Sequence, residues 1–174
     1  TLYRLAELEY QMKKVTKSYA YIKKTLAVDP YFLKARILEI KLLKRLKKES
    51  ELIHRSSQLL KDFPNNPKGH LFLASFYLNQ KKFHAAYPYL KTALKIAPEL
   101  ADVYKGFGNY YYEKGEFDNS LEYYQKALKL NPNFAEVYYN LALVSRIRKE
   151  YEKSVEYFTK AYELNKNLKL GHFF

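Results

Sequence analysis

The sequence contains no cysteine, only five glycines and no apolar run of about 18 residues. Without cysteine, the chain forms no disulfide, no thiolate metal site and no thiol nucleophile. A helix that crosses a bilayer needs about 20 consecutive apolar residues, so we expect no segment of this sequence to span a membrane. The glycines form no Gly-x-Gly-x-x-Gly loop, which excludes the usual phosphate-cradling motif.

Histidine is also scarce, and its four copies are dispersed as His54, His70, His84 and His172. They form no His-Glu-x-x-His pair and no other spacing that is typical of metal ligands. The paired carboxylates Glu150 and Glu152 lie beside Lys149 and Lys153, as expected on a solvated helix surface. The sequence therefore predicts no enzyme, no cofactor and no metal site.

The chain does contain a repeat, because Pro30, Pro64, Pro98 and Pro132 stand 34 residues apart. A fixed period between 20 and 50 residues is typical of repeat proteins, which bind through an extended surface. Similar side chains recur between the prolines. In the fourth period they are Tyr104, Phe107, Gly108, Tyr111, Ser120, Tyr124 and Ala127, and in the fifth Tyr138, Leu141, Ala142, Ser145, Ser154, Phe158 and Ala161.

Each period holds two stretches in which apolar residues follow helical spacing. Gly115 lies between the two stretches of the fourth period, where a left-handed residue can end a helix, and Pro132 cannot extend the second stretch. The small residues Gly108 and Ala127 would let the paired helices approach closely. One pair cannot bury its own apolar face, whereas stacked pairs can. The sequence therefore predicts an all-α superhelix (solenoid) of tandem 34-residue helix-turn-helix repeats.

This pattern resembles the tetratricopeptide repeat (TPR) family, whose signature the fourth period follows as Tyr104-x2-Phe107-Gly108-x2-Tyr111, then Ser120-x3-Tyr124 and Pro132. The resemblance covers essentially the whole chain, which we interpret as a single array over residues 1–174. We expect repeats at about 1–32, 33–66, 67–100, 101–134 and 135–168, with 169–174 beginning a truncated sixth unit.

Two places depart from the pattern. The second repeat has Arg36, Glu39 and Ser56 where the family keeps apolar or small residues, so we expect its packing to differ. Pro88 falls inside the second helix of the third repeat, where it removes a backbone donor. We expect this proline to kink or delay that helix.

The two ends lack the polar capping face that terminal repeats need. We therefore expect the chain to be a piece of a longer protein, with uncapped ends that can self-associate. Arrays of this family occur in the cytosol, the periplasm and organelles. The resemblance thus assigns no compartment, although we favour a soluble cytoplasmic protein over a periplasmic one.

The net charge of the chain is +13, and it is concentrated toward the start. Residues 1–66 carry 15 Lys and Arg against 7 Asp and Glu, and the densest run is Lys41, Lys44, Arg45, Lys47 and Lys48. Such a surface attracts an acidic peptide, a phosphate backbone or an anionic membrane.

The resemblance implies a concave groove, lined by one stripe of each first helix, that binds an extended peptide or a partner helix. From this we expect a protein-interaction scaffold whose protein or peptide partner has acidic or apolar character. The predicted groove residues are Lys41, Lys44, Arg45, Leu71, Phe72, Ser75, Lys105, Asn109, Tyr112, Tyr139, Asn140 and Arg146.

Some members of the family hold a C-terminal carboxylate with Lys and Asn residues at set positions. Lys105, Asn109 and Asn140 occupy three of these positions, but the last two fall on Leu170 and Phe174, which cannot make ionic contacts. We therefore do not expect such a carboxylate clamp here.

Two alternative functions remain open. The basic charge favours nucleic-acid binding, although most tyrosines are used by the repeat pattern and few are left to stack on bases. The array can also position an enzyme or an anchor that lies outside this chain.

Overall fold

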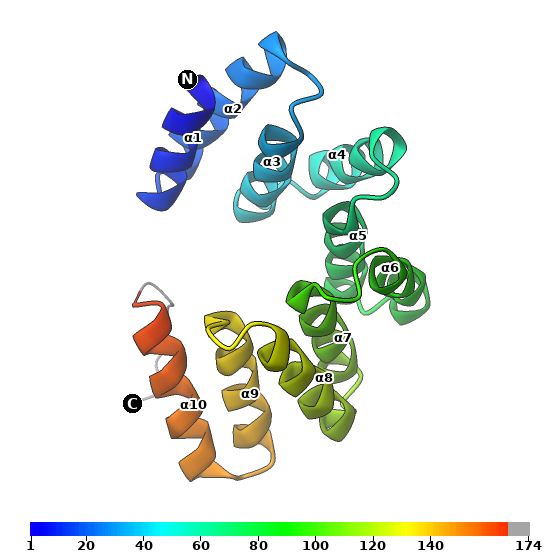
Figure 1. Ribbon diagram of the computed structural model, residues 1–174, viewed down its shortest axis with the longest axis vertical. Helices are drawn as coiled ribbons and strands as arrows, with labels where there is room; N and C mark the ends of the chain where they lie inside the picture. Colours follow the sequence, from blue (N-terminus) through cyan, green and yellow to red (C-terminus); the bar gives the residue numbers. More distant parts are fainter. Residues whose placement is uncertain (167–174) are drawn as a thin grey trace. The chain divides into compact units, whose positions relative to one another are not determined.

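The computed structural model describes residues 1–166, and this part of the chain consists of ten α-helices without a β-strand (Figure 1). The prediction of an all-α helical repeat is confirmed. The helices are α1 (Leu2–Gln11), α2 (Val15–Val28), α3 (Leu33–Arg45), α4 (Glu49–Asp62), α5 (Pro67–Asn79), α6 (Phe83–Ile96), α7 (Ala101–Glu113), α8 (Phe117–Leu130), α9 (Ala135–Ile147) and α10 (Tyr151–Leu164).

The helices repeat with the period of the prolines. The even-numbered helices each contain 14 residues and begin at Val15, Glu49, Phe83, Phe117 and Tyr151, in steps of 34 residues. The chain divides into two compact units, residues 1–73 and the residues from 74 onward, and the division falls within α5. The proposed sixth repeat at 169–174 lies outside the described residues, and the repeat boundaries remain a prediction.

The turn inside every helix pair is made by a residue with a left-handed backbone. Gly115 has a φ of 78°, as the sequence predicted. The equivalent residues Lys13, Lys47, Lys81 and Lys149 have φ values between 55° and 61°. In the fourth turn the N–H of Gly115 donates to the carbonyl of Tyr112 and the next N–H to that of Tyr111. These bonds satisfy carbonyl groups at the helix end, and they require the left-handed backbone. The four lysines therefore adopt a conformation in which their Cβ atoms are sterically strained, whereas Gly115 has no Cβ.

Paired helices pack a small side chain against a large one. A Cβ atom added to Gly108 in α7 would overlap the ring of Tyr124 in α8, which is 1% exposed. This close contact confirms the prediction that Gly108 lets the two helices approach closely. The equivalent pairs one period away are Ala74 with Leu90 and Ala142 with Phe158, again one small and one large residue.

A buried serine adds a hydrogen bond to three of these pairs. The hydroxyls of Ser18, Ser120 and Ser154 donate to carbonyls of the neighbouring odd-numbered helices at 2.7, 2.9 and 2.9 Å. The acceptors are Ala6, Gly108 and Ala142. Because the carbonyl belongs to the small residue of each pair, the short side chain and the serine fix the same close contact between the helices.

The second repeat reverses this choice of sizes. Ile40 stands where the other repeats have alanine or glycine, and Ser56 stands where they have a large apolar residue. Both are buried, with exposures of 1% and 0%. A large residue facing a small one fills the same space whichever helix carries it, so total volume is conserved. The helices α3 and α4 also approach each other less extensively than α7 and α8.

Pro88 does not delay its helix. The helix α6 begins at Phe83, at the same repeat position as its counterparts, and continues past the proline to Ile96. That part of the prediction is wrong. Pro88 is exposed, so its ring adds no bulk to the packed face of α6, and its carbonyl accepts a hydrogen bond from the Thr92 hydroxyl at 2.9 Å.

Candidate functional site

The first unit carries a pocket of about 380 Å3 on its odd-numbered helices, which we call the basic pocket. Its lining comes from α1, α3 and the start of α5. The lining residues are Tyr3, Glu7, Tyr10, Gln11, Lys34, Ile37, Leu38, Lys41 and Lys68. Of the predicted groove residues, Lys41 is the one that lines this pocket, and Arg45 stands next to it by contact with Tyr10.

Aromatic rings form one side of the basic pocket. The guanidinium carbon of Arg45 lies 4.2 Å from the centre of the Tyr10 ring, a cation–π contact that holds this ring in place. Burial, and then the hydrogen bond and charge of Glu7, raise the pKa of Tyr3 to about 12. Tyr3 is therefore a neutral phenol at physiological pH, and Glu7 is already engaged by it.

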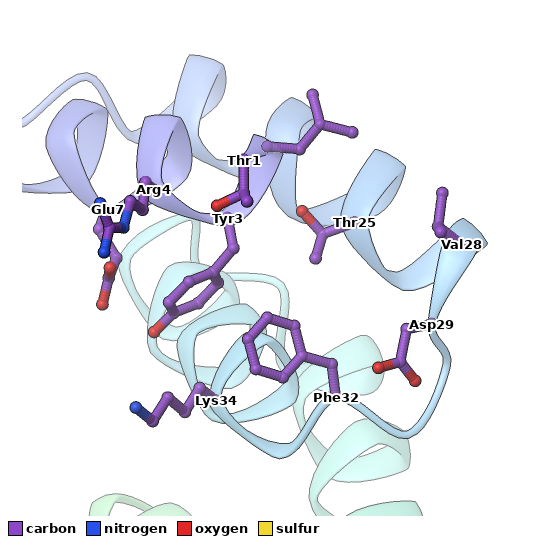
Figure 2. A pocket seen from close by; sticks show the side chains of 10 residues that line it. Thr1, Tyr3, Arg4, Glu7, Thr25, Val28, Asp29, Phe32 and Lys34 are labelled. Carbon is purple, nitrogen blue, oxygen red and sulfur yellow. The ribbon is translucent and has the colours of Figure 1, made fainter.

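A second pocket of about 540 Å3 adjoins the basic pocket and shares Tyr3, Glu7 and Lys34 with it (Figure 2). The Tyr3 and Phe32 rings lie side by side, with centroids 4.8 Å apart. In Figure 2 the Tyr3 hydroxyl points toward the side on which Glu7 and Lys34 lie, away from Val28. The rings thus lie between the side chains near the end of α2, namely Thr25, Val28 and Asp29, and those of Glu7 and Lys34 on α1 and α3.

The second unit has a pocket of about 210 Å3, which we call the amide pocket. It lies on α5, α7 and α9, with one side chain reaching in from α8. The lining residues are Ser75, Leu78, Asn79, Asn109, Tyr112, Glu113, Tyr124, Asn140 and Leu143. Four predicted groove residues, namely Ser75, Asn109, Tyr112 and Asn140, are brought together here.

Two asparagines and a tyrosine form a fixed network in the amide pocket. Asn109 Oδ1 accepts hydrogen bonds from the Tyr124 hydroxyl at 2.8 Å and from Asn140 Nδ2 at 2.9 Å. These bonds use both lone pairs of that oxygen. The Asn109 amide nitrogen and the Asn140 amide oxygen form no hydrogen bond within residues 1–166. One donor and one acceptor are therefore presented by two oriented side chains.

Tyr124 reaches this network because of Gly108. The ring crosses α7 at the glycine, and a Cβ atom there would lie 3.0 Å from Cζ and still closer to two other ring carbons. From the sequence, Tyr124 is recognised only as a recurring position of the repeat, and its hydroxyl has no predicted role. The available signal was the combination of glycine at 108 with a hydroxyl-bearing ring 16 residues later, which no other repeat has. Burial raises the pKa of Tyr124, so the hydroxyl remains a donor.

Lys105, another predicted groove residue, is already neutralised. Its Nζ lies 2.6 Å from Glu136 Oε2 and 3.3 Å from Asp102 Oδ1, and 4.6 Å from the centre of the Phe134 ring. An acidic ligand at Lys105 must displace Glu136. Together with Leu170 and Phe174, which lie outside the described residues, this pairing argues against a carboxylate clamp.

The other predicted residues are spread along the odd-numbered helices. Tyr139 packs edge-to-face on Phe158, with centroids 5.5 Å apart, which leaves it half-buried. Lys44 and Arg146 are exposed near the ends of their helices. Leu71 and Phe72 are half-buried on α5, and neither lines the basic pocket or the amide pocket.

The run Tyr110–Tyr112 does not form a free stacking platform. Tyr111 stacks on Tyr123 at 5.2 Å and meets Tyr110 edge-to-face at 5.1 Å. Tyr112 lies edge-to-face on Phe117 at 5.9 Å. Tyr110 and Tyr111 are thus covered by other rings, and Tyr112 lines the amide pocket, so the three rings do not form the continuous exposed surface on which nucleic-acid bases stack.

No group of three or more His, Asp or Glu side chains that could hold a metal ion occurs within residues 1–166. Over the same residues, no helix has the length and apolar character that crossing a membrane requires.

Comparison with known families identifies the repeat. Profiles named tetratricopeptide repeat match residues 67–100 and 135–168, and a TPR repeat profile matches residues 108–145. Together these matches span more than half of the chain. No curated protein sequence is significantly similar to the chain.

Solved structures agree with this assignment at the level of the fold. TTC0263, a thermophilic TPR protein of Thermus thermophilus, superposes with a TM-score of 0.86 at 19% identity, covering 95% of this chain and 91% of its own. The Cut9–Hcn1 assembly of the APC/C gives 0.83 at 17% identity, over 95% of this chain and 33% of that one. YrrB, described as a TPR protein with an unusual peptide-binding site, gives 0.55 at 18% identity, with coverages of 96% and 86%. The chain belongs to the tetratricopeptide repeat family, whose members are generally scaffolds for protein–protein interaction and typically not enzymes.

Proposed function

We propose that this chain is a protein-interaction module that holds a peptide segment or helix of a partner protein on its odd-numbered helices, without a catalytic step of its own. The observation that carries this proposal is the Asn109–Asn140 pair. The amide nitrogen of Asn109 can donate to a peptide carbonyl, and the amide oxygen of Asn140 can accept from a peptide N–H. A peptide group presents this same combination of one acceptor and one donor.

The pair is preorganised, which lowers the cost of binding. The Tyr124 hydroxyl and Asn140 both bond to the oxygen of Asn109, so the Asn109 side chain needs no reordering when a ligand arrives. In a partly buried pocket a hydrogen bond to the ligand is also electrostatically stronger than in water. Both effects strengthen binding of a peptide group by this pair, relative to binding by asparagine side chains that are fully solvated.

The walls of the amide pocket can hold an apolar side chain next to that peptide group. Tyr112, Leu78 and Leu143 supply apolar surface, and burial raises the pKa of Tyr112. The volume of about 210 Å3 is below the range of about 300–1,000 Å3 that is typical of small-molecule sites. A single side chain of an extended ligand suits this volume better than a cofactor. YrrB is a precedent for peptide binding within this fold.

The proposal is tested with peptides selected from a random 12-residue phage library on the full 174-residue chain. Selected peptides are synthesised, and their Kd values are measured by fluorescence anisotropy against the wild type, Asn109→Ala and Asn140→Ala. Each variant loses about one ligand hydrogen bond, so we expect Kd to rise about tenfold. Gln125→Ala, which removes an exposed amide from α8, is the matched control and leaves Kd unchanged.

Equal Kd values for the wild type and both asparagine variants, with all proteins folded by circular dichroism, would contradict the proposal. So would a selection that yields no peptide above background.

A further inference from the structure

We propose that the basic pocket of the first unit selects an acidic side chain, a carboxylate or a phosphate ester, that stands next to an apolar residue in the partner peptide. This inference rests on the proposed function and names the ligand chemistry of a pocket in the first unit.

The charge of the pocket is the first argument. Lys34, Lys41 and Lys68 converge on it from α3 and α5, whereas Glu7 is the acidic residue in its lining. Glu7 is engaged by the Tyr3 hydroxyl. Lys34 and Lys68 are exposed and form no ion pair with any described residue. Lys34 and Lys68 therefore bring positive charge to the pocket that no described residue neutralises.

Lys105 shows what a neutralised groove lysine looks like in the same molecule. Its Nζ lies 2.6 Å from Glu136 on the next odd-numbered helix, and its side chain is 19% exposed. At the position equivalent to Glu136, the preceding repeat has Asp102, and the two repeats before that have Lys68 and Lys34. At this repeated position the first unit therefore carries lysine where the second unit carries an acid, so the same helix position is basic in the first unit.

The apolar surface is the second argument, and it favours a peptide over a polyanion. Tyr3, Tyr10 and Ile37 are half-buried in the lining, and Arg45 fixes the Tyr10 ring at 4.2 Å. A phosphodiester chain has nothing apolar to place there and would meet the carboxylate of Glu7. A peptide can bury a leucine-sized side chain against these rings while its acidic neighbour meets the lysines. The adjoining pocket in Figure 2 extends the same surface beyond Tyr3 and Lys34.

The test uses the full chain and fluorescein-labelled peptides that are acetylated and amidated, so that no terminal charge takes part. In each peptide a leucine is flanked on both sides by two residues, which are glutamate, phosphoserine, glutamine or lysine. We expect the glutamate or phosphoserine peptide to bind at least about tenfold more tightly than the glutamine peptide, and the lysine peptide to bind least. The order of the two acidic peptides distinguishes a carboxylate site from a phosphate site.

The lysines of the pocket are tested as a triple variant, Lys34→Gln, Lys41→Gln and Lys68→Gln. This variant should bind the acidic peptides no better than the glutamine peptide. The matched control, Lys17→Gln, Lys24→Gln and Lys61→Gln, removes the same charge from exposed positions outside the pocket and should keep the preference. Thermal unfolding by circular dichroism checks that both triple variants remain folded.

Equal losses in the two triple variants would overturn the inference, because net charge alone would then explain binding. It would equally be overturned if inorganic phosphate or a 20-nucleotide single-stranded DNA displaced the acidic peptide as effectively as unlabelled peptide did. If acidic and neutral peptides bind alike while Asn109→Ala still weakens the phage-selected peptides, this inference fails and the proposed function stands. If the preference for acidic peptides is present but Asn109→Ala and Asn140→Ala leave the Kd of the phage-selected peptides unchanged, the role proposed for the Asn109–Asn140 pair fails and the inference about the basic pocket stands.

Discussion

Repeats two and four form the same helix pair from opposite choices of side chain. Repeat four places Gly108 against Tyr124, whereas repeat two has Ile40 and Ser56 at these positions. All four residues are buried. The comparison teaches that the pair requires a total side-chain volume and a turn, rather than a particular residue on either helix.

The same two repeats also differ in a second contact between their first and second helices. Repeat four uses rings, with Phe107 stacked on Tyr123 at 5.0 Å. Repeat two has the buried residue Glu39 at the position equivalent to Phe107, 3.5 Å from Arg55. Glu39 is buried whereas Arg55 is exposed, so the pair must offset the hydration that the Glu39 carboxylate loses, a cost that an apolar contact such as Phe107 on Tyr123 does not have. We infer that repeat two is the less stable of the two.

The largest expected effect comes from breaking the reversed pair of repeat two. Ile40→Ala leaves a cavity and should lower the free energy of unfolding by about 2–5 kcal/mol. Ser56→Leu alone overfills the site and should cost about 1–3 kcal/mol. Because the double variant restores the small–large order of the other repeats, it should cost at least about 1 kcal/mol less than the sum of the two. Urea unfolding of all four proteins measures this cycle, and strict additivity would contradict size compensation.

A smaller effect is expected in repeat four. Gly108→Ala forces its methyl group into the Tyr124 ring and should cost about 1–3 kcal/mol. In a Tyr124→Leu background the same change reproduces the Ala74 and Leu90 pair of repeat three, so its cost should fall below about 1 kcal/mol. Thermal unfolding of the single and double variants tests this. An equal cost of the alanine in both backgrounds would show that the ring is not the obstacle.

The turns provide the next comparison. Gly115→Ala places a Cβ on a left-handed residue and should lower stability by about 1–2 kcal/mol. Lys81→Gly relieves the same strain in the third turn and should raise stability by up to about 1 kcal/mol. Lys95→Gly, inside α6, is the control for glycine as such and should lower stability by about 1 kcal/mol. A loss of stability in Lys81→Gly equal to that of the control would refute the strain argument.

The smallest expected effect concerns Glu39 and pH. Burial raises the pKa of Glu39 above its ordinary value, although Arg55 and Arg36 oppose the shift. A group with a raised folded-state pKa holds its proton more tightly when folded, so stability falls as pH rises through that interval. Glu39→Gln, which cannot ionise, should therefore gain stability relative to the wild type as pH rises from about 4 to about 7. Urea unfolding at both pH values checks the sign, and an advantage that grows toward the acidic end would contradict it.

The sequence predicted much of the fold and less of the site. The proline spacing, Gly115 and the small residue Gly108 predicted the period, one turn and one close helix contact. The left-handed lysines went unpredicted because lysine has no preference for that conformation. The stripe of predicted groove residues came from the family resemblance together with helical spacing, and it remains a prediction. The pairing of Lys105 with Glu136 did not, because it joins residues 31 positions apart on different helices.

The most direct test of ligand binding on the odd-numbered helices is an NMR titration of the isotope-labelled chain with a phage-selected peptide. We expect the side-chain amide signals of Asn109 and Asn140 to shift in proportion to occupancy, while that of Gln125 on α8 stays in place. Shifts confined to even-numbered helices, with both asparagine signals unmoved at saturation, would contradict the proposed groove.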